Sequence, residues 1–438
     1  MLAILLSLLP FSGMMGCWQF FLVCFLSSPF ILYRGSLEGY VLSSIFMVDE
    51  WSGSLIFLSF WLGALMMMAA KPRISGLCVW GVVICCFLAF SCWSFVWFYV
   101  FFELTLVPMA YMIVKWGSQP ERVSATFYMF LYTLSGSLPF LIFLVSYYYS
   151  SYSSFMGFSW DVASSMGVWG CAVVVVFFVK IPCYPFHLWL TKAHVEAPTA
   201  GSMALAGLLL KLGGFGLMRA MGCFGQLSFS LQVFWANVGI WGGVLSSVAC
   251  LRQIDSKSLV AYSSVGHMSL VQLAILSGTT VGWVGALYMM IAHGLSSSGL
   301  FSVLGEFYGK VKSRSLVVYG GLEMVYPGSN LWWCLLIVCS MSCPPSLGFL
   351  GEVMMGMSIC SIFPFGYVLC FILLFFFGGA SMMVLYTSVM HGSFSTALIP
   401  SGVGISKCSY LGMFHGVPLI ILFFLPAFLS LRALSGVL

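Results

Sequence analysis

The stretch GSMALAGLLLKLGGFG, residues 201–216, places a single lysine, Lys211, in the middle of an otherwise apolar run. An ionised side chain at the centre of a bilayer costs about 2.5 to 3.5 kcal/mol even on the most lenient scale, so such residues usually pair or line a pathway. Three more runs have this form: WFYVFFELTLVPMAY (97–111) with Glu103, VVVVFFVKIP (173–182) with Lys180, and PPSLGFLGEVMM (344–355) with Glu352. The four runs predict membrane helices that carry ions.

The composition supports the same class of protein. Of the 438 residues, 61% are hydrophobic and only 6% are charged, which is more apolar surface than a soluble core can bury. The apolar runs are continuous over about 20 residues instead of alternating over about 10, which favours helices over a barrel. No basic cluster interleaved with aromatic residues suits nucleic acid. The sequence therefore predicts an all-α polytopic membrane protein.

Charged and turn residues divide the chain into candidate spans. The first 33 residues are expected to hold two more short crossings, because Pro10, Ser12 and Gly13 interrupt them, although one is also possible. The total is about 14 helices, or 13, in a single transmembrane domain over 1–438. The start has no presequence pattern, so the first helix itself is expected to insert. The other spans lie near 51–70, 74–93, 95–114, 123–148, 163–185, 199–219, 229–251, 258–278, 281–304, 328–350, 364–390 and 409–430.

Lysines and arginines gather on one side of these spans. Loops on the cytoplasmic or equivalent side carry an excess of Lys and Arg, so this bias sets the orientation and puts the C-terminus on the positive-poor side. The positive-rich side holds Lys71, Arg73, Lys115, Arg122, Lys192, Arg252, Lys257, Lys310, Lys312, Arg314 and Lys407. The other side holds only Arg34, Arg219 and Arg432.

Two runs combine a lone charge with helix-breaking residues. Lys180 is followed by Pro182, and Glu352 follows Pro344, Pro345, Gly348 and Gly351. Proline and glycine at membrane depth predict locally broken helices. Paired broken helices are typical of transporters built from two repeats.

Each lone charge has a structural alternative. Glu103 can cap a short helix or pair with an arginine, and Lys180, near the end of its span, can reach the interface, as Lys211 can less readily. The functional alternative is that the Glu103 carboxylate holds Lys180 in its charged form. An opposite charge within about 4 to 6 Å favours ionisation, whereas desolvation favours the neutral amine.

Several histidines are candidates for proton transfer. His293 in LYMMIAHGLSSSGLF lies beside Ser296 and other hydroxyls, and His267 in VAYSSVGHMSL is a weaker case. An unperturbed imidazole titrates near pH 6.5, which suits a relay, although a lone histidine is as often a packing residue. A polar mouth at the interface is predicted from HLWLTKAHVEAP, with His187, Lys192, His194 and Glu196, and the spacing of its two histidines does not fit a metal site.

The sixteen cysteines do not predict redox or metal chemistry. They lie within apolar runs and form no C-x-x-C motif. Buried cysteine behaves as a small hydrophobic residue, so we expect these to be packing residues.

Five strings, in unbroken order, resemble NADH dehydrogenase subunit 4, an antiporter-like membrane subunit of respiratory complex I. The most specific part is HLWLTKAHVEAPTAGSM with KLGGFG; Thr191 stands where the family commonly has proline. The strings are FFELTLVPMAYMIVKWGSQPERVSATFYMFLYTLSGSLPFL (101–141), FFVKIPCYPFHLWLTKAHVEAPTAGSMALAGLLLKLGGFGLMR (177–219), CLRQIDSKSLVAYSSVGHMSL (250–270), MIAHGLSSSGLF (290–301) and PPSLGFLGE (344–352).

The resemblance implies roles for single residues. Glu103 matches the glutamate that pairs with the first buried lysine, Lys180, and Lys211 matches the central lysine. His293 matches the linking histidine, and Glu352 the terminal glutamate, which is a lysine in subunits 2 and 5. The supporting polar residues are His187, His194, His267, Asp255, Lys257 and Ser296.

The resemblance also implies a fold and a function. We expect an antiporter-like fold with two inverted five-helix repeats, about 95–251 and about 258–400. The expected function is proton translocation in NADH:ubiquinone oxidoreductase, driven by electron transfer elsewhere. NADH, FMN, iron–sulfur clusters and ubiquinone would be bound by other subunits, with no cofactor in this chain. Subunits 2 and 5 and membrane lipids are the expected partners, in the mitochondrial inner membrane.

Two other functions stay open. A freestanding cation/proton antiporter would use the same buried charges with an ion gradient as its energy source. A structural spacer would hold its neighbours in place while its charges only satisfy one another. Ion flux without a redox arm favours the antiporter, and unaltered proton stoichiometry after neutralising Lys211 favours the spacer.

Overall fold

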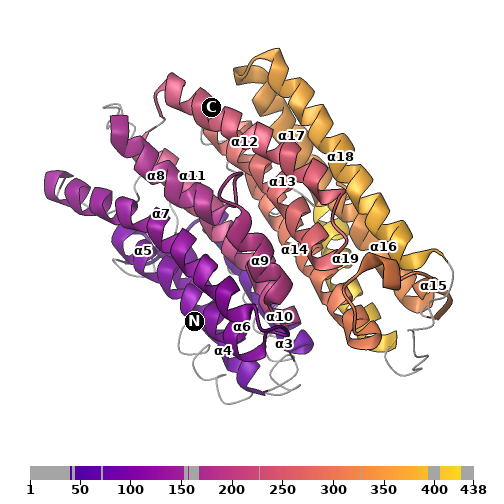
Figure 1. The fold of residues 1–438 in the computed structure, drawn as a ribbon. Coiled ribbons are helices and arrows are strands. Elements are labelled where there is room, and N and C mark those ends of the chain that lie inside the picture. The colour runs from indigo at the N-terminus through magenta and orange to yellow at the C-terminus, as the bar shows by residue number, and fades with distance from the viewer. Residues whose placement is uncertain are drawn as a thin grey trace. The chain divides into compact units, whose positions relative to one another are not determined.

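The computed structural model of the chain is almost entirely helical (Figure 1). It describes residues 40–41, 45–70, 73–151, 156, 167–225, 227–325, 327–392 and 405–425. The one or two crossings predicted in the first 33 residues lie outside the described residues. Nine helices of the described part are long and apolar enough to span a membrane, and four shorter apolar helices accompany them. The predicted membrane class is therefore confirmed, while the total of 13 or 14 helices stays a prediction.

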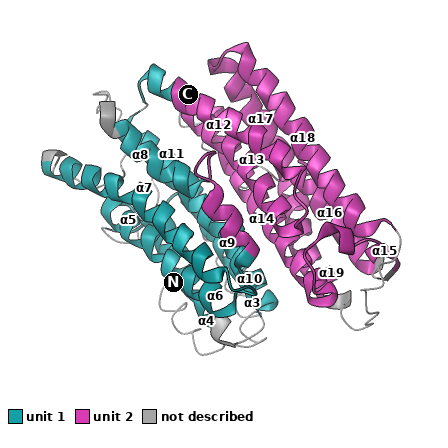
Figure 2. Cartoon of the chain, in the orientation of Figure 1, with its two compact units in different colours: residues 1–181, 196–232, 427–438 teal, residues 182–195, 233–426 magenta. Residues whose placement is uncertain are grey.

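The described chain divides into two compact units (Figure 2). Unit 1 comprises residues 1–181, 196–232 and 427–438, and unit 2 comprises residues 182–195 and 233–426. Residues 182–195 belong to unit 2 and residues 196–232 to unit 1, so neither unit is one continuous stretch of chain. The two sequence repeats, about 95–251 and about 258–400, stay a prediction.

Unit 1 is a bundle of helices with one small hairpin, in which β1 pairs antiparallel to β2. Helix α3 packs on α4, and α7 packs on α8. The elements are β1 (Tyr40–Val41), β2 (Met47–Val48), α3 (Glu50–Ala69), α4 (Arg73–Ser91), α5 (Phe95–Leu104), α6 (Leu106–Trp116), α7 (Arg122–Ser151), α8 (Gly167–Lys180), α10 (Thr199–Ala204), the π-helical segment η1 (Leu205–Leu209) and α11 (Leu210–Phe224).

Two interruptions in unit 1 fall next to lone charges. Between α5 and α6 the helix is broken at Thr105, where Pro108 has no N–H to donate to the carbonyl of Leu104. Between α10 and α11 the backbone widens into η1 just before Lys211. Single-turn π-bulges are rare and occur often at functional sites, because they release backbone groups from the regular ladder.

Unit 2 is built around the long helix α14, which packs on α13, α16, α17 and α19. Most of α9 and α12 also belong to this unit. Its elements are α9 (Leu188–Glu196), α12 (Phe229–Cys250), α13 (Ser256–Leu276), α14 (Thr280–Val311), the 3-10 helix η2 (Leu316–Val318), α15 (Leu322–Val325), α16 (Pro327–Ser340), α17 (Leu347–Ile362), α18 (Phe365–Met390) and α19 (Ile405–Phe424).

The predicted broken helices are confirmed, but one predicted span is wrong. Helix α8 ends at Lys180, just before Pro182, and the chain turns before α9 begins. The span 328–350 is not continuous, because α16 ends at Ser340 and α17 begins at Leu347. Two consecutive prolines between them supply no backbone N–H and disfavour helical backbone in the preceding residue. Glu352 therefore lies on a separate helix.

Candidate functional site

Lys180 is the last residue of α8 and is buried within unit 1, with 1% of its surface exposed. Its Nζ donates a hydrogen bond of 3.3 Å to the carbonyl oxygen of Phe102 on α5. The same nitrogen lies 3.9 Å from the centroid of the Phe102 ring, close enough for a cation–π interaction. The alternative that Lys180 reaches the interface is wrong, because its ammonium group ends inside the bundle.

Glu103 is the neighbour of Phe102 on α5, beside this lysine. Neither oxygen of its buried carboxylate has a hydrogen-bond partner among the described residues. Its charge acts on Lys180 electrostatically, but Lys180 donates to Phe102 and not to the carboxylate. The two charges predicted to pair are thus neighbours without a direct hydrogen bond. A carboxylate left in this way is costly for a purely structural role.

Lys211 is fully buried in unit 1, so the alternative that it reaches the interface is also wrong. Its Nζ donates a hydrogen bond of 2.6 Å to the carbonyl oxygen of Ala206, which lies within η1. The wider π-helical turn gives the lysine a backbone acceptor within its own helix. Gly213, two residues later, lets α11 approach the end of α8, since an added Cβ would lie 3.0 Å from the backbone nitrogen of Ile181.

In unit 2, three titratable side chains from three helices follow one another. Nδ1 of His267, on α13, lies 3.5 Å from Oε1 of Glu352, on α17. The ring centroid of His267 lies 5.9 Å from that of His293, on α14. Glu352 and His293 are both buried, with 5% and 3% of their surfaces exposed. His267, the weaker candidate in the sequence, is therefore the direct neighbour of Glu352 and connects it to His293.

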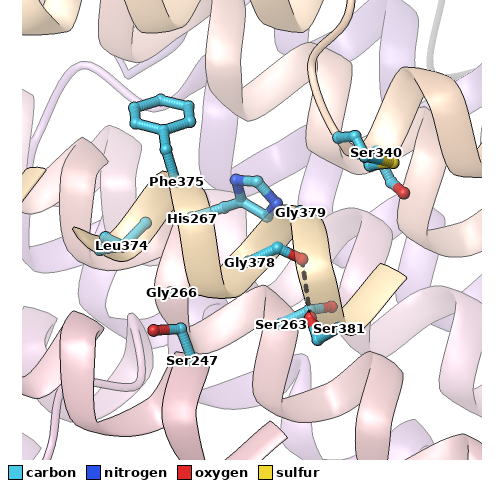
Figure 3. A pocket seen from close by; sticks show the side chains of 11 residues that line it. Ser247, Ser263, Gly266, His267, Ser340, Leu374, Phe375, Gly378, Gly379 and Ser381 are labelled. Atoms are coloured by element: carbon cyan, nitrogen blue, oxygen red, sulfur yellow. Dashed lines mark hydrogen bonds between the residues drawn. The ribbon is translucent and has the colours of Figure 1, made fainter. Parts of the chain in front are cut away.

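A small cavity lies beside His267 (Figure 3). Its volume is about 20 Å³, which is room for about one water molecule. Hydroxyl groups of four serines line it together with the imidazole, from helices α12, α13, α16 and α18. The serines are Ser247, Ser263, Ser340 and Ser381. A water molecule in this space could exchange a proton with the imidazole.

Two glycines hold the helix of Glu352 against α14. A Cβ added to Gly351 would lie 2.9 Å from the backbone nitrogen of Met289, and one added to Gly285 would lie 2.9 Å from that of Met355. Real Cβ atoms do not approach backbone so closely. The main chains of α14 and α17 are therefore in direct contact at Gly351, the residue before Glu352.

Among the residues of the polar mouth predicted from HLWLTKAHVEAP, only Lys192 is exposed, whereas His187, His194 and Glu196 are buried. The His187 ring stacks on Tyr184 at 4.8 Å, and the His194 ring stacks on Phe301 at 4.6 Å. Both histidines are buried. The polar residues of HLWLTKAHVEAP predicted an interface, but His187 stacks on a tyrosine three residues before it and His194 on a phenylalanine of α14.

Asp255 and Lys257 stand apart from the His267 cluster. The Asp255 carboxylate caps α13 by accepting the backbone N–H of Lys257 at 3.0 Å. Ten residues of helix separate Lys257 from His267, a rise of about 15 Å. Ser296 is buried on α14, one turn after His293.

A partly buried ion pair in unit 1 has no counterpart in the sequence predictions. Arg219 was assigned to the positive-poor loops, but it lies inside α11 with 1% of its surface exposed. Its Nη2 lies 2.5 Å from both carboxylate oxygens of Asp49, which precedes α3. The guanidinium also lies 4.9 Å from the Phe215 ring. The two residues are 170 positions apart, so no local pattern could have paired them.

Comparison with protein families gives two matches that together cover most of the chain. Residues 93–380 match the family described as "NADH:quinone oxidoreductase/Mrp antiporter, TM". Residues 1–76 match the family described as "NADH-ubiquinone oxidoreductase chain 4, amino terminus".

Relatives from animals match over nearly the whole length. The chain is 38% identical over 422 residues to NADH-ubiquinone oxidoreductase chain 4 of Paracentrotus lividus, covering 92% of this chain and 90% of the relative. It is also 38% identical over 432 residues to chain 4 of Locusta migratoria, covering 95% and 96%.

Solved structures share the fold at low sequence identity. A chain of respiratory complex I from Thermus thermophilus matches with a TM-score of 0.86 at 21% identity, covering 99% of this chain and 97% of that one. A chain of the Mrp complex from Dietzia sp. matches with a TM-score of 0.82 at 16% identity, covering 98% and 92%. The antiporter-like fold is therefore confirmed. By the family models and by its relatives, this chain belongs to the NADH-ubiquinone oxidoreductase chain 4 family.

Proposed function

We propose that this chain translocates protons in the membrane arm of NADH:ubiquinone oxidoreductase. The redox chemistry belongs to other subunits, which would bind NADH, FMN, iron–sulfur clusters and ubiquinone. The observation that carries the proposal is the pair of Glu103 and Lys180, a buried carboxylate without a hydrogen-bond partner among the described residues beside a buried ammonium group. The distance between the carboxylate and the ammonium group can change, and the protonation state of the lysine changes with it.

The first step takes place at Lys180. When Glu103 approaches, its negative charge favours the protonated lysine. When Glu103 withdraws, the buried lysine is left without its counter-charge and releases its proton, which Lys211 accepts. Electron transfer elsewhere in the complex would drive this movement of the carboxylate.

The second step uses the His293, His267 and Glu352 series. The proton would reach this series through water and leave through Glu352. The 3.5 Å distance between His267 and Glu352 supports direct transfer between them. The cavity beside His267 supports exchange with water.

The energies are of the right size. Moving one charge against the membrane potential costs about 2.3 kcal/mol per 100 mV. Two unit charges 4 Å apart attract each other by about 4 kcal/mol at an effective dielectric constant of about 20. If Glu103 closes to that distance from Lys180, opening and closing the pair involves enough free energy to move a proton across.

The partners and the location follow from the family. We propose that subunits 2 and 5 are the neighbours of this chain in the mitochondrial inner membrane, with the positive-rich loops in the matrix. The animal relatives support this location.

The test of membership is native-gel separation of mildly solubilised source membranes. Peptide mass spectrometry should find the chain in a very large band that carries NADH dehydrogenase activity. The fold match to the Mrp complex makes a cation/proton antiporter the second candidate. A smaller band without NADH dehydrogenase activity would favour that antiporter.

Replacing Glu352 by glutamine should lower proton pumping while electron transfer continues. The amide cannot carry a proton on and off, and one proton-transfer group commonly contributes on the order of 100-fold or more to a rate. Proton uptake per NADH oxidised, measured in vesicles with the assembled complex, checks this. Glu306→Gln is the matched control, because Glu306 lies 3.3 Å from Lys407 and takes no part in the series. Equal pumping in both variants would remove Glu352 from the route.

A further inference from the structure

Helix α4 and the interrupted helix α5–α6 of unit 1 enclose an apolar groove of about 530 Å³. Four residues of α4, from Leu77 to Cys85, form one wall, and four residues from Leu104 to Tyr111 form the other. The floor is where Gly81 faces Pro108, since an added Cβ would lie 3.4 Å from the proline Cβ. The absence of a side chain at Gly81 leaves this space open.

One end of the groove is cationic and aromatic. Lys115, exposed on the last turn of α6, donates a hydrogen bond of 2.9 Å to the hydroxyl of Tyr111, which lines the groove. The Lys115 charge also acts on the thiol of Cys78 in the opposite wall. Trp116 lies beside this lysine, with its ring 5.5 Å from Nζ. Tryptophan, tyrosine and lysine mark the headgroup level of a membrane, and Lys115 belongs to the positive-rich side.

The length of the groove fits an acyl chain within one leaflet of a bilayer. Its walls extend over eight residues of helix, about 12 Å. The apolar half-thickness of a bilayer is about 15 Å.

We propose that this groove binds one acyl chain of a glycerophospholipid from the leaflet on the side of the positive-rich loops. The phosphate lies at Lys115 and Tyr111, where the ammonium group and the phenol hydroxyl meet. The chain then follows Cys78 and Gly81 toward the centre of the membrane. Charge complementarity at one end and an apolar wall below it match the two parts of such a lipid. The inference does not depend on the proton route.

The test uses the complete chain in its native membranes. A phosphatidylglycerol with a diazirine in one acyl chain is added, the membranes are irradiated, and peptides of this chain are analysed by mass spectrometry. Adducts are expected on residues 77–85 and 104–111, and excess unlabelled phosphatidylglycerol should remove them. Adducts spread evenly over other exposed apolar helices, such as α18, would overturn the proposal. Cross-links from the groove to another polypeptide would assign it to a protein partner instead.

Two variants separate the parts of the site. Gly81→Phe fills the groove and should abolish the adducts, whereas Gly366→Phe should leave them, because an added Cβ at Gly366 on α18 meets nothing within 4 Å. Lys115→Gln should weaken labelling by about fivefold, the usual contribution of one lysine near an anionic surface. Undiminished labelling in Lys115→Gln would rule out a phosphate at this position. If the Gly81→Phe protein does not accumulate in the membrane, the competition with unlabelled phosphatidylglycerol still tests whether the groove binds lipid.

Discussion

Replacing Lys180 by alanine is expected to abolish proton transfer through this chain while the membrane arm stays assembled. The Lys180 ammonium group donates to α5, and its loss removes the charge on which Glu103 acts. Alanine at position 180 leaves a small cavity but no buried charge without a partner, so the protein should still fold. Pumping in reconstituted vesicles should fall by on the order of tenfold or more relative to NADH oxidation.

Two further variants test whether charge or packing is responsible. Glu103→Asp keeps the carboxylate and should be milder than Glu103→Gln, whereas equal severity would indicate packing. Lys407→Ala removes a lysine with 40% of its side chain exposed and should leave pumping unchanged. Full pumping by an assembled Lys180→Ala complex would contradict the role assigned to Lys180.

Replacing Asp49 by alanine is expected to destabilise unit 1 strongly. The guanidinium of Arg219 would remain buried without its carboxylate, and breaking a buried pair in this way typically costs about 3 to 5 kcal/mol. The amount of assembled complex on native gels, and its loss on heating, measure this effect. Removing both charges together, in Asp49→Asn with Arg219→Met, should recover much of the loss.

The double replacement is the decisive comparison. If Asp49→Ala and the double variant are equally unstable, the pair contributes through packing and not through charge. If Asp49→Ala is as stable as the unchanged protein, Arg219 is satisfied by other groups. The Asp49 carboxylate also accepts the hydroxyl of Ser52 at 2.8 Å, which asparagine can still do.

The general fold could be predicted because hydrophobicity is a local property. Each apolar run of about 20 residues identifies a span without knowledge of its neighbours. The division of 328–350 was missed, although Pro344 and Pro345 were recognised as helix breakers, because an apolar run gives no sign of where a helix ends. The π-helical turn of η1 also has no sequence signal, since GSMALAGLLLK reads as a regular helix.

The site was predicted less completely than the fold. Lys180, Lys211 and Glu352 could be identified because each is a lone charge in an apolar run. Such a charge is unusual whichever neighbours its helix packs against. The contact of His267 with Glu352 depends on how α13 and α17 cross, which a single sequence does not specify. The stacking of His194 on Phe301 was missed for the same reason.

The main-chain crossing at Gly285 and Gly351 has a consequence for how this protein can vary. Because backbone atoms approach closely at this crossing of α14 and α17, we expect the height of the Glu352 carboxylate to depend less on the volumes of the surrounding core side chains. Core side chains can change over generations, within their packing limits, while the carboxylate keeps its place. We therefore expect substitution to be tolerated poorly at Gly285 and Gly351 and more readily at the core positions around them.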